Sequence, residues 1–238
     1  MKSVTDLSIK IFGDGAELPG MLALYRQPYI RGFTTNPTLM NKAGIRDYRA
    51  FAKEVVAAIP DRPVSFEVFT DELDEMERQA REIATWGDNV YAKIPVTNTR
   101  REPTYDLIDR LSHGGVKVNV TAVMTLAQVQ DIVARLRGGA ASCVSVFAGR
   151  IADTGRDPVP IMAAAVELLR KERNIELIWA SPRELLNIFQ ADEIGCHIIT
   201  ATQDILGKLP GVGKDLDEYS LETVRMFYND AQRAGFTL

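Results

Sequence analysis

The chain has 238 residues, of which 46% are hydrophobic and 25% are charged, and its formal net charge is −4. This composition is typical of a globular protein, and the acidic balance excludes the basic surface of most nucleic-acid-binding proteins. The only cysteines, Cys143 and Cys196, lie in separate apolar runs and are expected to be core residues, and there are two histidines, so neither a disulfide framework nor a transition-metal site is expected. No leader pattern or apolar run of membrane-spanning length occurs, which predicts a cytoplasmic location.

Short runs rich in β-branched and aromatic residues alternate with longer amphipathic stretches along the chain. The predicted strands cover residues 7–14, 32–36, 63–69, 89–96, 116–123, 141–149, 175–181 and 196–202. Helices are predicted between them, most clearly over 71–86, 126–137, 160–172 and 220–235. Ser220 is the predicted N-cap of the last helix.

This alternation, with about 25 residues per unit, predicts an α/β fold: a single closed (β/α)8 TIM barrel domain over residues 1–238, with an extra C-terminal helix. An open doubly wound sheet is the alternative. Such a sheet usually carries a GxGxxG loop after its first strand, and the glycines of residues 12–20 lack this spacing. The closed barrel is therefore favoured.

Polar residues at the carboxyl ends of barrel strands converge on one site. Because successive side chains of a strand point to opposite faces, Glu67, Lys93, Asn119 and Thr121 are expected to face the interior, and Ala122 to lie on the opposite face from Thr121. The other polar residues at or just beyond the strand ends are Asp14, Thr34, Thr35, Asn36, Ser145, Arg150, Ser181 and Arg183.

Several of these residues also have an ordinary structural explanation. Asn36 precedes a proline and suits a helix cap, and Asp14 between two glycines suits a turn. Thr121 is a common type of strand residue, and a lone strand lysine such as Lys93 usually reaches solvent at an edge. Glu67 is harder to explain, because a carboxylate flanked by apolar residues needs a buried partner. The convergence of all five at one rim favours a catalytic site.

Lys93 lies in the run VYAKIPVT, where a charged amine is costly unless it is paired or gives up its proton. A neutral lysine amine can attack a ketone and form a Schiff base, whose iminium ion lets an adjacent carbon–carbon bond break or form. This chemistry requires no metal or other cofactor, so none is expected. It requires proton carriers, for which Glu67 and Asp14 are available, while Arg150 and Arg183 are suited to binding a phosphate.

Several motifs resemble those of the transaldolase family, in the same order and with similar separation. They are FGDGAE (12–17), GFTTNPTL (32–39), YAKIPVT (91–97), KVNVT (117–121), SVFAGRI (145–151) and WASPRE (179–184). The resemblance spans nearly the whole chain. The short length is similar to that of the compact branch, which includes the fructose-6-phosphate aldolases.

The resemblance implies a role for each candidate residue. Lys93 matches the Schiff-base lysine, and Asp14 matches the acid–base group that acts on the C4 hydroxyl. Glu67 and Thr121 match the pair that holds the catalytic water. The implied substrate-binding residues are Thr35, Asn36, Asn119, Ser145, Phe147 and Ser181, and the implied phosphate-binding residues are Arg150 and Arg183.

The resemblance also implies a transferase of the pentose phosphate pathway of carbohydrate metabolism. Such an enzyme moves a dihydroxyacetone unit from sedoheptulose 7-phosphate or fructose 6-phosphate to glyceraldehyde 3-phosphate or erythrose 4-phosphate. Glu67 and Phe147 are similar to the transaldolase pattern, whereas the aldolases tend to have Gln and Tyr at these positions. The alternatives are a lyase that releases free dihydroxyacetone, an enzyme of a specialised sugar pathway, and a catalytically silent sugar-phosphate-binding barrel.

The resemblance suggests a homo-oligomer, either a pentamer or a decamer. The predicted last helix is a candidate contact through Val224, Phe227 and Tyr228, although these side chains could instead pack on their own barrel. Small-molecule sugar phosphates are the expected partners, with no nucleic acid and no membrane.

Overall fold

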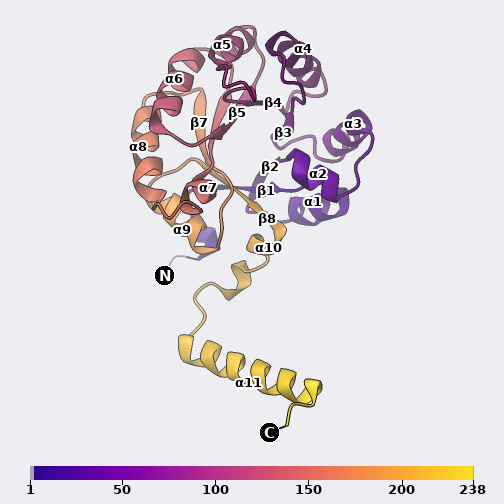
Figure 1. Cartoon of the computed structure of the whole chain (residues 1–238), viewed down its shortest axis with the longest axis vertical. Coiled ribbons are helices and arrows are strands. Elements are labelled where there is room, and N and C mark those ends of the chain that lie inside the picture. Colours follow the sequence, from indigo (N-terminus) through magenta and orange to yellow (C-terminus); the bar gives the residue numbers. More distant parts are fainter. Residues whose placement is uncertain (1–2, 238) are drawn as a thin grey trace.

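A closed barrel of eight parallel strands forms the body of the protein in this computed structural model, which describes residues 3–237 (Figure 1). Neighbouring strands follow chain order, and the last strand pairs with the first. Each strand overlaps a run predicted from the sequence, so the predicted TIM barrel is confirmed and the open sheet is wrong. The strands are β1 (Lys10–Asp14), β2 (Ile30–Thr34), β3 (Val64–Glu67), β4 (Val90–Pro95), β5 (Val118–Val123), β6 (Ser142–Val146), β7 (Ile175–Trp179) and β8 (Ile198–Thr202).

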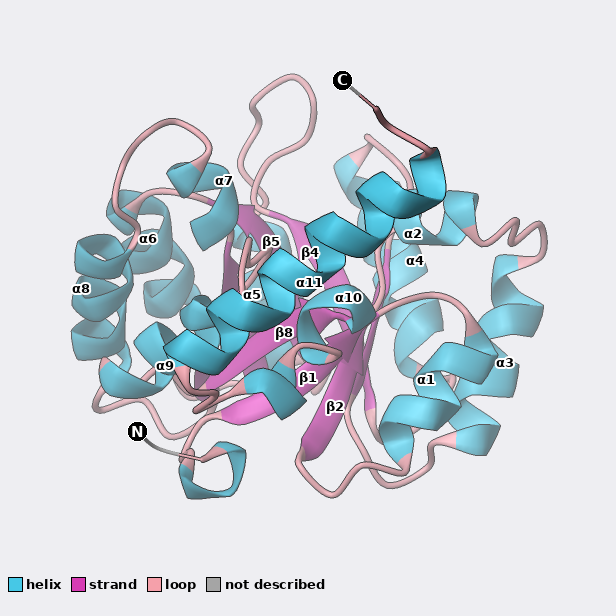
Figure 2. Cartoon of the chain, turned by 90° about the horizontal axis from the view of Figure 1, so that it is seen from below, coloured by secondary structure: helices cyan, strands magenta, loops and turns pink. Residues whose placement is uncertain are grey.

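Helices surround the strands on the outside of the barrel (Figures 1 and 2). In α4 (Leu73–Ala84), for example, Met76, Ala80 and Ile83 are buried toward the barrel, as expected for an amphipathic surface helix. Short 3-10 turns occur at Val4–Asp6 and Leu209–Gly211. The helices are α1 (Leu18–Tyr25), α2 (Pro37–Lys42), α3 (Tyr48–Ala58), α4 (Leu73–Ala84), α5 (Tyr105–His113), α6 (Leu126–Leu136), α7 (Ala148–Ala152), α8 (Val159–Leu169), α9 (Leu186–Glu193), α10 (Gln203–Leu206) and α11 (Leu216–Ala234).

The apolar core has two parts, because alternate strand residues face opposite sides of the barrel wall. The larger part lies between strands and helices and includes Ala92 and Ile94 of β4. A smaller cluster fills the inside of the barrel and contains Phe12, Cys143, Ile178, Ala180 and Ile198. Both cysteines are buried, which confirms that they are core residues.

One strand residue departs from the predicted alternation. Ala122 of β5 has a φ of 60°, in the left-handed region that disfavours residues with a Cβ. The pairing of β5 with β6 shifts register between Val120 and Val123, around this residue. The prediction that Ala122 lies on the opposite face from Thr121 is therefore wrong, because the local backbone brings both residues to the wall of the central cavity.

The last helix, α11, begins earlier than predicted and lies away from the barrel (Figure 1). Asp215 is its N-cap and accepts hydrogen bonds from the backbone N–H groups of Asp217 and Glu218, so the prediction that Ser220 is the cap is wrong. Within the described part of the chain, no residue of α11 is buried. Across residues 3–237, no helix is both long enough and apolar enough to cross a bilayer.

The apolar side chains of α11 are unusually exposed. Val224, Phe227 and Tyr228 are 59%, 63% and 64% exposed. The alternative that these side chains pack on their own barrel is therefore wrong, and the helix presents an uncovered apolar surface.

Candidate active site

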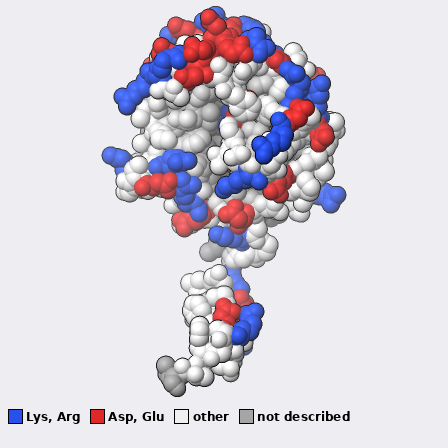
Figure 3. Space-filling model, turned by 45° about the vertical axis from the view of Figure 1, so that its right-hand side comes forward, with Lys and Arg blue, Asp and Glu red and all other residues white. Residues whose placement is uncertain are grey.

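A cavity of about 570 Å³ opens at the carboxyl ends of the strands, where the molecular surface is hollowed (Figure 3). This volume is typical of a site for a small molecule. Among the residues predicted to form the site, only Thr35 and Asn119 do not line this cavity. The others are on its wall: Asp14, Asn36, Glu67, Lys93, Thr121, Ser145, Phe147, Arg150, Ser181 and Arg183.

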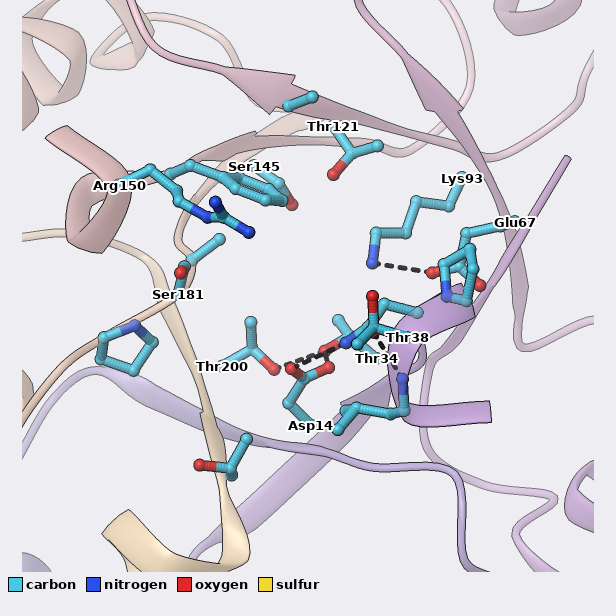
Figure 4. Close-up of a pocket in the computed structure, with 18 of the residues that line it drawn as sticks. Asp14, Thr34, Thr38, Glu67, Lys93, Thr121, Ser145, Arg150, Ser181 and Thr200 are labelled. Carbon is cyan, nitrogen blue, oxygen red and sulfur yellow. Dashed lines mark hydrogen bonds and ion pairs between the residues drawn. The ribbon is translucent and has the colours of Figure 1, made fainter. Parts of the chain in front are cut away.

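Lys93 and Glu67 form a buried pair on this wall (Figure 4). They are neighbours because β3 and β4 pair with these two residues in register. Lys93 Nζ lies 2.9 Å from Glu67 Oε1 and 2.6 Å from the carbonyl oxygen of Thr35. Lys93 is 7% exposed, so the interpretation of a solvated edge lysine is wrong. The prediction that the amine gives up its proton stays a prediction.

Two opposing effects act on the pKa of Glu67. Burial raises the pKa of Glu67, because a charged carboxylate is poorly solvated there, and the nearby Lys93 amine opposes this shift. The Thr35 hydroxyl also donates to Glu67 Oε2 at 2.9 Å. A carboxyl with a raised pKa beside an amine can accept a proton from it and later return the proton, which is the behaviour required of a general acid–base.

Asp14 is the second carboxyl of the cavity and is half-buried at the end of β1. Its Oδ1 accepts a hydrogen bond from the Thr34 hydroxyl at 2.8 Å, and its Oδ2 accepts one from the Asn36 amide at 3.3 Å. Burial raises the pKa of Asp14, and the Lys93 charge is the largest opposing effect. Asp14 thus has fixed donors and does not merely form a turn.

Asn36 has two structural tasks at the start of α2. Its side-chain oxygen accepts a hydrogen bond from the Leu39 N–H at 2.9 Å, which confirms the predicted helix cap. Its side-chain nitrogen, on the other side of the same amide, donates to Asp14. Because the cap fixes which end of the amide faces the helix, it also directs the donor toward the carboxyl.

The two threonines at the end of β2 serve different carboxyls. Thr34 donates to Asp14 of β1, whereas Thr35 donates to Glu67 of β3. This division follows from the position of β2 between β1 and β3. Thr35 is fully buried and does not line the cavity, so its role as a substrate ligand stays a prediction.

Thr121 presents a hydroxyl group on the cavity wall. Its Oγ1 atom is buried and has no hydrogen-bond partner among the described residues. An unpaired buried hydroxyl is costly unless a water or ligand atom binds it. The next residue, Ala122, has a strained backbone in the left-handed region, and such strain is common at functional sites.

Asn119 lies beneath the cavity wall and connects its neighbours. It is fully buried, donates to Ser65 Oγ at 3.0 Å and accepts from Ser145 Oγ at 2.7 Å. These bonds tie β3, β5 and β6 together and orient the Ser145 side chain, which lines the cavity. The predicted direct contact between Asn119 and substrate stays a prediction.

The two arginines predicted to bind phosphate differ in their environment. Arg183 donates from Nε and Nη2 to the two carboxylate oxygens of Asp153, and the bond from Nε to Asp153 Oδ1 is 2.8 Å. This pairing holds the pKa of Asp153 below its usual value. Arg150 makes no hydrogen bond or ion pair with any residue that the structure describes, and it lies with Ser181 across the cavity from Lys93 (Figure 4). Arg150 is therefore the more available anion ligand.

The structure adds cavity residues that the sequence did not single out as site residues. The sequence predicts Thr34 only as a strand-end residue and predicts β8 as a strand without a site residue. The alternation of side chains in that strand could have indicated that Thr200 and Thr202 share a face. The additional polar side chains on the wall are Thr34, Thr38, Thr200, Thr202 and Asp204.

Solved structures share the barrel fold. Dihydrodipicolinate synthase from Rhodopseudomonas palustris matches with a TM-score of 0.58 and 15% identity, covering 97% of this chain and 81% of that protein. A 2,3-dimethylmalate lyase matches with a TM-score of 0.53 and 12% identity, covering 98% of this chain and 86% of that one. At these identities the likeness concerns the fold alone.

Curated relatives are much more similar in sequence. A protein of Dehalococcoides mccartyi named "Probable transaldolase" is 36% identical over 200 residues, which is 83% of this chain and 88% of the relative. Proteins of the same name from Streptococcus agalactiae and Streptococcus pyogenes are 36% and 33% identical, covering 81% and 84% of this chain and 85% and 90% of the relatives. The family described as Transaldolase/Fructose-6-phosphate aldolase matches residues 11–238. The chain therefore belongs to the transaldolase/fructose-6-phosphate aldolase family.

Proposed function

We propose that this protein is a transaldolase that transfers a dihydroxyacetone unit from a ketose phosphate to an aldose phosphate through a Schiff base on Lys93. Membership of the family supports a transaldolase-type enzyme. The observation that carries the proposal is the buried Lys93 amine on the cavity wall, in contact with the Glu67 carboxyl. An amine in this position can reach a bound ketone and has a proton acceptor beside it.

The first step is formation of the Schiff base. Lys93 passes a proton to Glu67, and the free amine adds to the keto carbon of the donor sugar to form a carbinolamine. Glu67 then returns a proton to the carbinolamine hydroxyl, which leaves as water while the C=N bond forms. The unpaired Thr121 hydroxyl is available to bind this water. Reversal of these steps releases the product at the end of the cycle.

The second step breaks the bond between C3 and C4 of the sugar. Asp14 accepts the proton of the C4 hydroxyl, and the electron pair of the broken bond moves into the iminium group to give an enamine. The aldehyde fragment leaves. An acceptor aldehyde then takes its place, the enamine carbon adds to it, and Asp14 returns the proton to the new hydroxyl.

The phosphate of the substrate has a natural place on the opposite side of the cavity. The unpaired Arg150 and the side chain of Ser181 lie there (Figure 4). Arg183 lines the same wall and can join Arg150 once it exchanges the Asp153 carboxylate for a phosphate oxygen. A sugar phosphate would thus extend across the cavity, with its keto group at Lys93.

Phe147 favours transfer over release. It lines the cavity and its ring has no proton to donate, so the enamine would persist until an acceptor aldehyde arrives. A lyase that releases free dihydroxyacetone remains the alternative activity within the same family.

Borohydride trapping and an acceptor assay test this proposal. Incubation with fructose 6-phosphate and borohydride should add one dihydroxyacetone or hexose unit to the peptide that contains Lys93, as measured by mass spectrometry. Release of more than one molecule of glyceraldehyde 3-phosphate per active site should require the acceptor erythrose 4-phosphate. Sustained release without acceptor would establish the lyase, and no adduct with any ketose phosphate would rule out the Schiff-base enzyme.

We also propose that copies of the chain associate into a homo-oligomer through α11. The support is the exposed apolar surface of this helix, which no part of its own barrel covers in the described structure.

A further inference from the structure

Two threonine hydroxyls connect β8 with the Asp14 carboxyl (Figure 4). The Thr34 hydroxyl donates to Asp14 Oδ1 at 2.8 Å, and the Oγ1 atoms of Thr34 and Thr200 lie 2.5 Å apart. Thr34 and Thr200 are 1% and 5% exposed, so bulk water has little access to this contact. The two threonines come from the strands on either side of β1. This hydrogen-bond chain, Thr200–Thr34–Asp14, therefore exists only because the barrel is closed.

The direction of these hydrogen bonds follows from proton counting. A threonine hydroxyl has one hydrogen. When Asp14 is ionised, Thr34 gives its hydrogen to the carboxylate, so Thr200 must donate in the contact with Thr34. When Asp14 carries a proton on Oδ1, it can donate to Thr34, and Thr34 can then turn its hydrogen toward Thr200. The hydrogen-bond chain can therefore donate in either of two directions, and each direction matches one protonation state of Asp14.

We infer that Thr200 is a positioning residue for Asp14: by donating to Thr34, it holds the Thr34 hydroxyl toward the ionised carboxylate and reverses when Asp14 accepts a proton. This inference rests on the proposed function, in which that proton comes from the C4 hydroxyl of the sugar. Thr200 acts through Thr34, since no direct hydrogen bond joins Thr200 to Asp14 among the described residues.

The packing of Phe12 and Gly32 supports a fixed geometry of the hydrogen-bond chain. Phe12 points to the same face of β1 as Asp14, two residues earlier, and belongs to the apolar cluster inside the barrel. A Cβ on Gly32 would lie 2.5 Å from the Phe12 ring, so this glycine leaves the space that the ring occupies. Among the described residues, the two hydroxyls have only the carboxyl and each other as hydrogen-bond partners, which makes the orientation of each depend on the other.

The effect on the titration of Asp14 has a definite sign. Burial raises the pKa of Asp14, while Lys93 of β4 and the Thr34 and Asn36 donors oppose this shift, and Glu67 of β3 is the other nearby carboxyl. Replacing Thr200 by Val removes the donor to Thr34 and weakens the stabilisation of the ionised carboxylate. The pKa of Asp14 should then rise further. As the pH is lowered, activity that requires ionised Asp14 should therefore already be lost at a higher pH than in the wild type.

The pKa of Asp14 can be measured directly by carbon-13 NMR of the free protein labelled at its aspartate side chains. The Asp14 resonance is assigned from its absence in the Asp14→Asn variant. Thr200→Val should raise the pH midpoint of the Asp14 signal by about half a unit, and Thr34→Val by about one unit. Thr200→Ser, which keeps the hydroxyl, should restore the wild-type midpoint. Ser142→Ala, which removes a buried hydroxyl bonded to Ala140, is the matched control and should leave the midpoint unchanged.

The same variants should move the acidic limb of kcat/KM for sugar-phosphate cleavage in the same direction, with Thr200→Ser again restoring it. Thr200→Ala replaces Thr200→Val if circular dichroism shows that the valine variant does not fold. An unchanged Asp14 midpoint in the Thr200 variants, or a shift that serine does not restore, would overturn the positioning role. Because the NMR titration does not depend on turnover, this result is independent of borohydride trapping, whose failure would instead reject the proposed function.

Discussion

At the scale of single residues, the pairing of Lys93 with Glu67 is unusual because both side chains are almost fully buried. Removing a charge from water costs several kcal/mol, and a buried pair recovers this only with good geometry and further hydrogen bonds. Here the carbonyl oxygen of Thr35 binds the amine and the Thr35 hydroxyl binds the carboxyl. A pair this costly is better explained by reactivity than by stability.

Lys93→Ala should abolish both turnover and borohydride trapping while the barrel stays folded. The expected loss in kcat is on the order of 10⁴-fold or more, because the covalent intermediate cannot form without the amine. Lys53→Ala is the matched control, since Lys53 is an exposed lysine of α3, and it should retain trapping and turnover. Trapping that persists in Lys93→Ala would place the Schiff base on another amine.

The pairing of Arg183 with Asp153 is expected to affect the KM for phosphorylated substrates. Arg183→Ala should raise KM about tenfold for phosphorylated substrates and have little effect for non-phosphorylated ones, because one charge-assisted contact is lost. Asp153→Ala should lower that KM about twofold to threefold, because the guanidinium is released from its carboxylate. Arg170→Ala, at the exposed C-cap of α8, is the control. If KM did not respond to Arg183→Ala, the phosphate site would lie elsewhere.

At the scale of elements, the approach of α7 to the loop after β7 shapes the phosphate side of the cavity. Gly149 in α7 lies so close to this loop that a Cβ there would be 1.6 Å from the carbonyl oxygen of Ser181. Ser181 itself has a φ of 59°, in the left-handed region. The glycine and the strained serine together allow Arg150 and Ser181 to line the same wall.

Gly149→Ala should therefore destabilise the protein. Overpacking typically costs about 1–3 kcal/mol, and contact with a backbone oxygen, which cannot rotate away, places this site at the upper end. The measurement is the midpoint of urea unfolding, together with KM for the ketose phosphate, which should rise as the loop shifts. Gly211→Ala, where a Cβ meets no atom within 4 Å, should change neither quantity.

At the scale of the whole molecule, the barrel is complete without its last helix. Eight strands close the sheet, while α11 extends away from the barrel with its apolar side chains in solvent (Figure 1). Exposed apolar side chains also occur on the barrel itself, at Phe69, Met124 and Leu186. We propose a second copy of the chain as the partner that covers α11, because association into a homo-oligomer would remove these apolar side chains from solvent.

Phe227→Asp should disrupt this oligomer, because burying an unpaired carboxylate in an apolar interface is costly. Size-exclusion chromatography with light scattering should show the wild type as an oligomer and the variant as smaller species. Asn229→Asp places the same charge at an exposed polar position of the same helix and should leave the assembly intact. A monomeric wild type at micromolar concentration would contradict the proposal.

The sequence by itself determined the barrel and the rim on which the site lies. Period-two apolar runs alternating with amphipathic helical stretches specify strands and helices locally, and strand direction brings Asp14, Glu67 and Lys93 to one end. It could not specify side-chain partners. Thr200 meets Thr34 across 166 positions only because β8 closes on β1, and Arg183 is held by Asp153 from a different segment of the chain.

The position of α11 and the turn of Ala122 onto the cavity wall likewise depended on the tertiary structure. The periodicity of α11 indicates an apolar face but not what covers it, and alternation within a strand fails where the register shifts. Local patterns arise from the preferences of neighbouring residues and can be read along the chain. Contacts between distant segments depend on how the barrel closes, and only the folded molecule decides them.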